Sequence, residues 1–397
     1  MENISIIGQT CCGCRACEQS CHKHAIAFKE DEEGFLQPHI DQDKCVNCGK
    51  CLKACPIHTV NVCHEEQKGY AAKTTSDADL KECSSGGLFY EMAKYVCGQN
   101  GVVCGCGVDD SLMPHHVIAT TLEEARQLRG SKYVQSSMGN IYTQVKEYLD
   151  KGVIVLFTGG PCQVAGLKNY LTKGYDNLYC VDIICHGVPS RKLYATYLKW
   201  LSDKYGAISS VEFRSKKRHQ WSLTLNVTSK NNGRIQEHLK IASLDPYYYN
   251  FLEGNTYRES CYACPYSQNN RPGDITIGDF WGIENTHPEL FDIRGVSCAL
   301  VNSDKGRQLW ASVEPGLDAT EVELSDIINY NGNLRLPTKR KPIRDVVYQA
   351  LNENGFDAIP YELPLKSRVI DSLKNYIPNV WRYKIKTMLK RWRRTHS

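Results

Sequence analysis

The chain of 397 residues contains no hydrophobic run of about 18 residues, so nothing in it resembles a membrane-spanning helix. Its N-terminus lacks the basic start of a secretory signal. With 48 basic and 44 acidic side chains, its net charge of +4 is too small to indicate a nucleic-acid-binding protein. The G-x-G-x-x-G and Walker A sequences are absent, so a standard Rossmann nicotinamide site is not indicated. We therefore expect a cytoplasmic protein of two to three domains, at about 150 residues each, in a reducing or anaerobic context.

Cysteine, in contrast, is abundant, with 20 residues in the chain. In an exported protein this number would suggest disulfides, but without a signal sequence it indicates metal ligands. Two runs near the N-terminus share the spacing C-x-x-C-x-x-C-x-x-x-C, one over residues 11–21 and one over 45–55. This is the spacing of two-cluster bacterial ferredoxins, in which the fourth cysteine of each run ligates the cluster of the other run.

The two runs therefore predict two [4Fe–4S] clusters. A zinc module is the alternative, because C-x-x-C pairs also hold zinc, but zinc would leave regularly spaced cysteines unused. Apolar residues on both sides of residues 31–34 predict a β-hairpin between the runs. The first cluster is assigned to Cys11, Cys14, Cys17 and Cys55, and the second to Cys45, Cys48, Cys51 and Cys21.

Strand and helix patterns alternate further along the chain. We predict a ferredoxin-type module over residues 1–62, a polar linker over 63–80 and an α/β domain over 81–340. Apolar runs at 102–108, 153–157 and 178–184 are typical of buried strands, and 88–96 and 163–168 of helices. Glycine-rich turns at 86–87 and 159–160 lie where helices begin, a position that suits an anion.

Six motifs between about residues 80 and 300 resemble, in their order, those of the beta subunits of coenzyme F-420 hydrogenases and dehydrogenases, a family of iron–sulfur flavoproteins. Each motif is weak alone, but the set is specific. The motifs are Ser84-Ser85-Gly86-Gly87, Gly130-Ser131-Lys132-Tyr133-Val134-Gln135-Ser136, Gly160-Pro161-Cys162-Gln163, Cys185-His186-Gly187-Val188-Pro189-Ser190, Cys261-Tyr262-Ala263-Cys264 and Gly278-Asp279-Phe280-Trp281-Gly282.

This resemblance implies a bound FAD and a third [4Fe–4S] cluster. The fold is then an α+β ferredoxin-like N-terminal module followed by an α/β flavin-binding domain, with parts at about 81–165 and 166–340. The alternatives to a role in the third cluster are that Cys162 or Cys185 is a small core residue, or that Cys83 replaces one of the expected ligands. The expected FAD contacts are Ser84, Ser85, Gly86, Gly87, Lys132, Tyr133, Gln135 and Ser136, and the expected third cluster ligands are Cys162, Cys185, Cys261 and Cys264.

His186 and Asp279 are candidate proton donors near the flavin. The alternative for His186, which we favour, is a hydrogen bond that tunes a cluster. Asp279 could equally cap a helix or support a turn. A basic run follows a short strand and could bind an anionic substrate, but a solvated loop is the favoured interpretation; it comprises Arg214, Lys216, Lys217 and Arg218.

The C-terminal extension, residues 341–397, is expected to be helical and basic. Residues 383–394 alternate basic with apolar and aromatic side chains, a pattern that suits the surface of an anionic membrane. The alternative is a basic tail that packs on the domain or on a partner. A membrane contact would make a lipid-linked precursor of envelope polysaccharide a plausible substrate.

We therefore predict a flavin- and iron–sulfur-dependent oxidoreductase. A ferredoxin or another low-potential donor would supply single electrons, and FAD would exchange hydride with a small-molecule or lipid-linked saccharide substrate. The alternative is an electron-transfer beta subunit of a larger hydrogenase or dehydrogenase complex that uses a deazaflavin coenzyme. A homo-oligomer is compatible with either, and the direction of the reaction stays open.

Overall fold

The computed structural model describes residues 2–63, 67–231, 233–378 and 381. The N-terminal module comprises η1 (Ile4–Thr10), α1 (Ala16–Gln19), β1 (Ile26–Glu30), β2 (Leu36–Ile40) and α2 (Lys50–Ala54). The two strands pair antiparallel, with Ile26 opposite Ile40, so the predicted hairpin is confirmed. Its small core mixes isoleucines of η1 and β1 with the cysteines.

An eight-stranded mixed sheet forms the centre of the larger domain, in the order β13-β3-β12-β11-β7-β6-β4-β5. The neighbours β4, β6, β7 and β11 run parallel, and the other pairs are antiparallel. The predicted buried strands are all present. The strands are β3 (Lys68–Thr74), β4 (Val102–Val108), β5 (Pro114–Ala119), β6 (Val155–Gly159), β7 (Leu178–Ile183), β11 (Ile275–Asp279), β12 (Ser297–Val301) and β13 (Leu317–Val322).

The prediction of a linker over residues 63–80 is wrong for part of this segment, because Lys68–Thr74 forms β3 between β12 and β13. Small residues conceal this strand in the sequence. Gly69, Ala71 and Ala72 pack where larger side chains do not fit, and a Cβ on Gly69 would lie 3.0 Å from the carbonyl oxygen of Val322.

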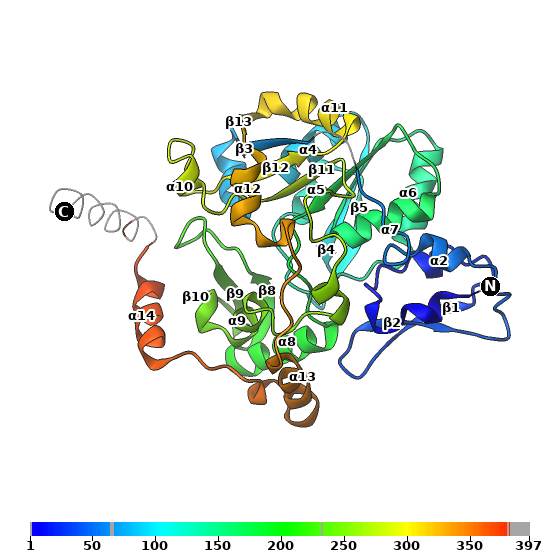
Figure 1. Cartoon of the computed structure of the whole chain (residues 1–397). Helices are drawn as coiled ribbons and strands as arrows, with labels where there is room; N and C mark the ends of the chain where they lie inside the picture. Colours follow the sequence, from blue (N-terminus) through cyan, green and yellow to red (C-terminus); the bar gives the residue numbers. More distant parts are fainter. Residues whose placement is uncertain (1, 64–66, 232, 379–380, 382–397) are drawn as a thin grey trace.

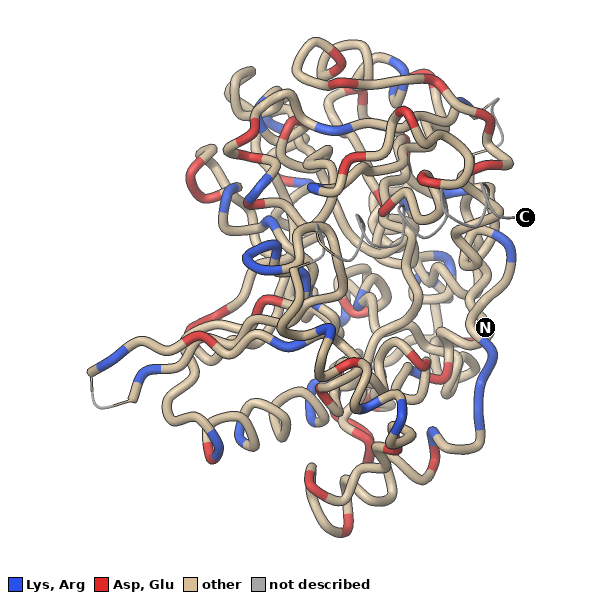
Figure 2. Tube along the Cα trace, turned by 90° about the vertical axis from the view of Figure 1, so that its left-hand side faces the viewer, with Lys and Arg blue, Asp and Glu red and all other residues tan. Residues whose placement is uncertain are grey.

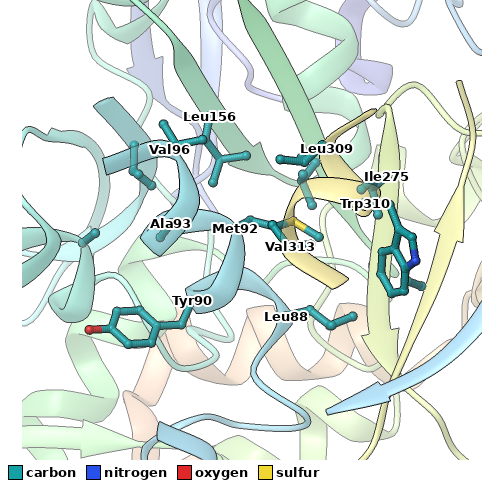
Figure 3. Close-up of a cluster of buried hydrophobic side chains, with 14 of the residues drawn as sticks. Leu88, Tyr90, Met92, Ala93, Val96, Leu156, Ile275, Leu309, Trp310 and Val313 are labelled. Atoms are coloured by element: carbon teal, nitrogen blue, oxygen red, sulfur yellow. The ribbon is translucent and has the colours of Figure 1, made fainter. Parts of the chain in front are cut away.

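Helices cover both faces of the sheet. On one face, α4 (Leu88–Gly98) and α11 (Asp304–Val313) pack on Leu156 and Ile275 (Figure 3). On the other face, α6 (Ile141–Asp150) and α7 (Pro161–Leu171) pack on the alternate strand residues Val155 and Phe157. The N-terminal module lies against α6 and α7 (Figure 1).

A second, three-stranded antiparallel sheet was not predicted from the sequence. It consists of β8 (Ala207–Glu212), β9 (Thr224–Asn231) and β10 (Arg234–Ile241). An aromatic core joins it to α8 (Arg191–Tyr205), α9 (Pro246–Leu252) and α13 (Ile343–Asn354). The remaining elements are α3 (Asp77–Glu82), α5 (Leu122–Gln127), α10 (Ile283–Thr286), α12 (Leu324–Tyr330), α14 (Leu365–Tyr376), η2 (Ala242–Leu244), η3 (Glu259–Ala263), η4 (Glu314–Gly316), η5 (Gly332–Leu334) and η6 (Phe356–Ala358).

Within the described ranges, no helix is long and apolar enough to cross a membrane. The predicted basic segment at 383–394 lies outside the described residues. Basic and acidic residues are interspersed along the described chain (Figure 2), in agreement with the small net charge.

Candidate functional site

The first predicted cysteine set lies on the inner side of the N-terminal module. The thiol of Cys17 interacts electrostatically with those of Cys11 and Cys55. Burial, with a smaller part from neighbouring thiols, raises the pKa of Cys17 and raises that of Cys55 to about 12. Buried thiolates this close together require a cation, which iron would supply. All four members of the set, Cys11, Cys14, Cys17 and Cys55, are buried.

The second predicted set lines one cavity at the outer side of the module. Cys48 is exposed there. The backbone N–H of Ala25 donates to the Sγ of Cys21 at 3.4 Å, and hydrogen bonds of this kind tune cluster potentials. The cysteines that line the cavity are Cys21, Cys45, Cys48 and Cys51.

Among the residues that the structure describes, no three or more histidine, cysteine, aspartate or glutamate side chains are placed to hold a single metal ion. A cubane contains four irons, so its thiolates stand further apart than the ligands of one ion. The argument for clusters over zinc is the spacing of the two cysteine runs, because zinc would leave regularly spaced cysteines unused.

The first set faces the α/β domain across a buried junction. Arg258 is 1% exposed, and its guanidinium donates to the carbonyls of Cys11 and Leu36 and to the Oε1 of Gln135. The amide of Gln135 in turn donates to the carbonyl of Cys12 at 3.1 Å. These bonds fix the first cysteine loop on the larger domain.

The third predicted set comes together from three segments. Cys162 lies in the first turn of α7, Cys185 follows β7, and Cys261 and Cys264 lie in and directly after η3. Their thiols interact electrostatically with one another. The interaction with Cys12 and then burial raise the pKa of Cys162, and burial raises the pKa of Cys261, of Cys264 and, to about 11, of Cys185. In contrast, Cys83 lies beside Gly87, with its thiol among the charges of Arg129 and Lys216, so it does not replace a member of this set.

Cys12 connects the first set with the third. Its thiol interacts with those of Cys14 and Cys162, which lowers the pKa of Cys12 and raises the pKa of each of the other two. Helix α7 makes this approach possible, because a Cβ on Gly166 would lie 3.1 Å from the Sγ of Cys14. The two cysteine sets are therefore separated by a single thiol in the protein interior.

A second polar centre, which we call the arginine hub, joins the predicted flavin segments. Arg214 donates to both carboxylate oxygens of Asp279, at 2.6 and 2.8 Å. The same guanidinium donates to the carbonyl of Ser84 and the hydroxyl of Tyr133. The arginine hub consists of Arg214, Asp279, Ser84 and Tyr133 together with Trp221, whose Nε1–H donates to Asp279 at 2.6 Å.

The Ser84–Gly87 turn is held tightly at this hub. The N–H of Gly86 donates to the Oγ of Ser297 at 2.8 Å, and a Cβ at this position would lie 2.3 Å from the carbonyl of Ala72. Ser131 donates to the Oγ of Ser84, so the two predicted flavin segments are neighbours. Gly87 begins α4 with a positive φ of 90°.

Lys216 contacts this turn and is 8% exposed. Its Nζ donates to the carbonyls of Leu80 and Ser85, both at 2.7 Å. Burial, reinforced by Arg214, lowers the pKa of Lys216 to about 8. The favoured interpretation of the basic run as a solvated loop is therefore wrong for Arg214 and Lys216, although Lys217 is exposed and pairs with Glu237.

The remaining predicted flavin residues make contacts within the protein. Lys132 donates to the carbonyls of Leu128 and Arg129, and Tyr133 stacks on Phe251 with a ring separation of 4.3 Å. The amide of Gln135 belongs to the junction described above. The Oγ of Ser136 lies 2.7 Å from the Nδ1 of His116.

Of the two candidate proton donors, Asp279 does not fit that role. Although burial opposes ionisation, Arg214 and Trp221 lower its pKa, so it remains a carboxylate. The alternative interpretation of Asp279 as a supporting residue is the better one. His186 is exposed and lies close enough to Asp279 and Arg214 to interact with both. Partial enclosure by the surrounding protein and the charge of Arg214 lower the pKa of His186, while the charge of Asp279 raises it.

The sequence marks Arg214 only as part of a basic run, and it gives no signal for Arg258 or Cys12. Important partners of these residues lie far along the chain, with 65 residues between Arg214 and Asp279 and 247 between Arg258 and Cys11. A hint for Arg214 is its position directly after an aromatic residue at a strand end.

The comparisons with protein families agree with the sequence motifs. Residues 153–328 match the family model for the C-terminal part of the beta subunit of coenzyme F420 hydrogenase/dehydrogenase. Residues 10–59 match the 4Fe-4S dicluster domain. The chain therefore contains one region that matches each of these two models, in the predicted order, which confirms the predicted resemblance and supports an oxidoreductase.

Two curated relatives match a short stretch of this chain. The ferredoxin-type protein NapF of Haemophilus influenzae is 37% identical over 49 residues, and that of Escherichia coli K12 is 36% identical over 47 residues. These matches cover 12% of this chain and 28% and 29% of the two relatives.

Among solved structures, a chain of the F420-reducing [NiFe] hydrogenase complex from Methanosarcina barkeri is 16% identical, with a TM-score of 0.45. The match covers 75% of this chain and 90% of that chain. Likeness at this level defines neither fold nor function.

Proposed function

We propose that this chain is an electron-transfer beta subunit of a hydrogenase or dehydrogenase complex. Its three cysteine sets would hold [4Fe–4S] clusters, and the arginine hub would hold FAD. The observation that carries this proposal is the contact of Cys12 with both Cys14 and Cys162, because electron transfer slows steeply with distance.

The charges at the hub support a bound anion. Arg214 and Lys216 bring two buried cations, and Asp279 supplies one carboxylate. Burial is the main cause of the lowered pKa of Lys216, and the positive charge of Arg214 adds to it. The diphosphate of FAD would restore the balance, beside the glycine turn that begins α4.

A bound flavin would supply the exchange between one-electron and two-electron chemistry. The chain's own residues would hold the flavin site in shape and exchange a proton with the substrate. Asp279 holds Arg214 in place, and Lys216 holds the Ser84–Gly87 turn through its carbonyls. His186, which is exposed beside the hub, would take or give a proton at a substrate.

The partners of this subunit follow from the matched family. Its description names coenzyme F420, so we propose a deazaflavin as the two-electron partner and a larger catalytic subunit or low-potential carrier at the cluster end. The lipid-linked saccharide expected from the sequence stays a prediction, because no contact among the described residues favours it.

The test uses protein purified without oxygen, in which flavin is extracted, identified and counted per chain. We expect about one FAD per chain and reversible reduction of the deazaflavin coenzyme. Folded, brown protein that neither contains nor takes up flavin would contradict the flavin site. Protein that keeps FAD but exchanges no electrons with the coenzyme would contradict the proposed two-electron partner.

A further inference from the structure

Helix α14 carries its apolar side chains on the side that faces solvent. Leu365 and Tyr376 are each 76% exposed, and Leu373 is 61% exposed. With Val369, these residues follow a spacing of four, four and three, so they form one stripe along the helix. Ile370 and Ile377, both at least 39% exposed, widen this stripe.

The polar side of the same helix contacts the protein. Asn375 is 9% exposed, and its Oδ1 accepts from the N–H of Ile241 at 2.9 Å. Its carbonyl lies 3.1 Å from the Nε2 of His219. Asp371 accepts from the hydroxyl of Ser243 at 2.8 Å. These contacts fix α14 against β10, at one edge of the molecule (Figure 1).

This orientation is the reverse of an ordinary surface helix, which buries its apolar stripe against the core. An exposed apolar stripe of this length marks an interaction surface. The charge of the sequence from α14 onward favours one class of partner. After Asp371 the sequence contains no aspartate or glutamate, and its basic residues are Lys374, Arg382, Lys384, Lys386, Lys390, Arg391, Arg393 and Arg394.

We propose that α14 binds the surface of a membrane that contains anionic lipids. Its apolar stripe would enter the headgroup region, and the basic side chains would attract the lipid charge. Lys366, on the apolar side of the helix, can extend its ammonium to the headgroups. A second copy of this chain is a poorer partner, because it would bring the same positive charge to the interface. This inference is independent of the proposed electron-transfer function.

The test is flotation of the full-length, iron-loaded protein with vesicles of phosphatidylcholine alone or with about a third phosphatidylglycerol. We expect binding to the anionic vesicles, weakened by about 0.5 M salt, and little binding to the neutral ones. L365E places a charge in the stripe and should weaken binding by about tenfold. The matched control is L336E, because Leu336 is 72% exposed outside α14 and receives the same charge.

Three outcomes would overturn the proposal. One is absence of binding to either vesicle by protein with full iron content. Another is equal loss of binding in L365E and L336E. The third is a homodimer, measured by light scattering, that L365E dissociates while vesicles bind neither form.

Discussion

Arg214 connects three segments that are remote in sequence, namely the Ser84 turn, the Tyr133 loop and the end of β11. Its guanidinium lies 5.3 Å from the ring centre of Trp281, which stacks on Trp221. Because the guanidinium is planar and multiply bonded, lysine cannot reproduce these contacts. Arg214 is therefore the residue on which the proposed flavin site depends most.

We predict that R214M loses at least about nine-tenths of its FAD but keeps its iron. Removing a buried partner leaves Asp279 as an unpaired charge, which costs about 3–5 kcal/mol of stability. Flavin and iron per chain are measured together, with the exposed Arg335 as the control in R335M. R214M that retained full FAD would contradict the assignment of the site to the hub.

At the scale of elements, apolar runs predicted the buried strands well, because strands covered on both faces consist of large apolar residues. They did not predict β3, where glycine and alanine are required, or the second sheet, whose β10 carries mostly polar residues. The cysteine spacing predicted the two N-terminal sets, whereas the third set was expected only from the resemblance to a known family, because its members lie far apart in the sequence. The junction and the hub could not be predicted, because their partners meet only through the tertiary fold.

His116 of β5 is a buried histidine that makes the free energy of unfolding depend on pH. Its Nε2 lies 3.1 Å from the carbonyl of Thr158 at the end of β6, and its Nδ1 lies 2.7 Å from Ser136. Burial lowers the pKa of His116 to about 4. The folded protein therefore keeps the ring neutral, while the unfolded chain binds a proton below about pH 6.5.

We predict that this histidine lowers the free energy of unfolding as the pH falls from about 6.5 to 4, by at most about 3 kcal/mol. H116Q cannot take up the proton, so this part of the pH dependence should disappear. Denaturant unfolding at several pH values measures it, with iron content followed in parallel. Identical slopes for wild type and H116Q in this range would show that the ring does not determine the dependence.

At the scale of the whole molecule, the N-terminal module is fixed to the larger domain by buried arginines. Arg258 reaches the carbonyls of Cys11 and Leu36, and Arg344 forms an ion pair with Glu33 of the β1–β2 turn. Because both guanidiniums are about 1% exposed, their bonds are protected from water. The contact between the first and third cysteine sets depends on this docking.

We predict that R258M loosens the module without unfolding the larger sheet. In R258M, the rate of backbone hydrogen exchange should rise over residues 10–40. In R258K, which keeps the positive charge but not the planar guanidinium, the rate should lie between those of R258M and the wild type. Exchange that stayed unchanged over these residues would show that Arg258 does not hold the junction.

The most direct test of the account is the iron content of anaerobically purified wild type and of the double variant C162S/C264S, together with their electron paramagnetic resonance spectra. Three [4Fe–4S] clusters predict about twelve irons in the wild type and about eight in the variant, with the signals of the N-terminal pair retained. Spin coupling between the first and third clusters should be present only in the wild type. A wild-type protein with about eight irons, unchanged by the substitutions, would contradict the third cluster and the electron path through Cys12.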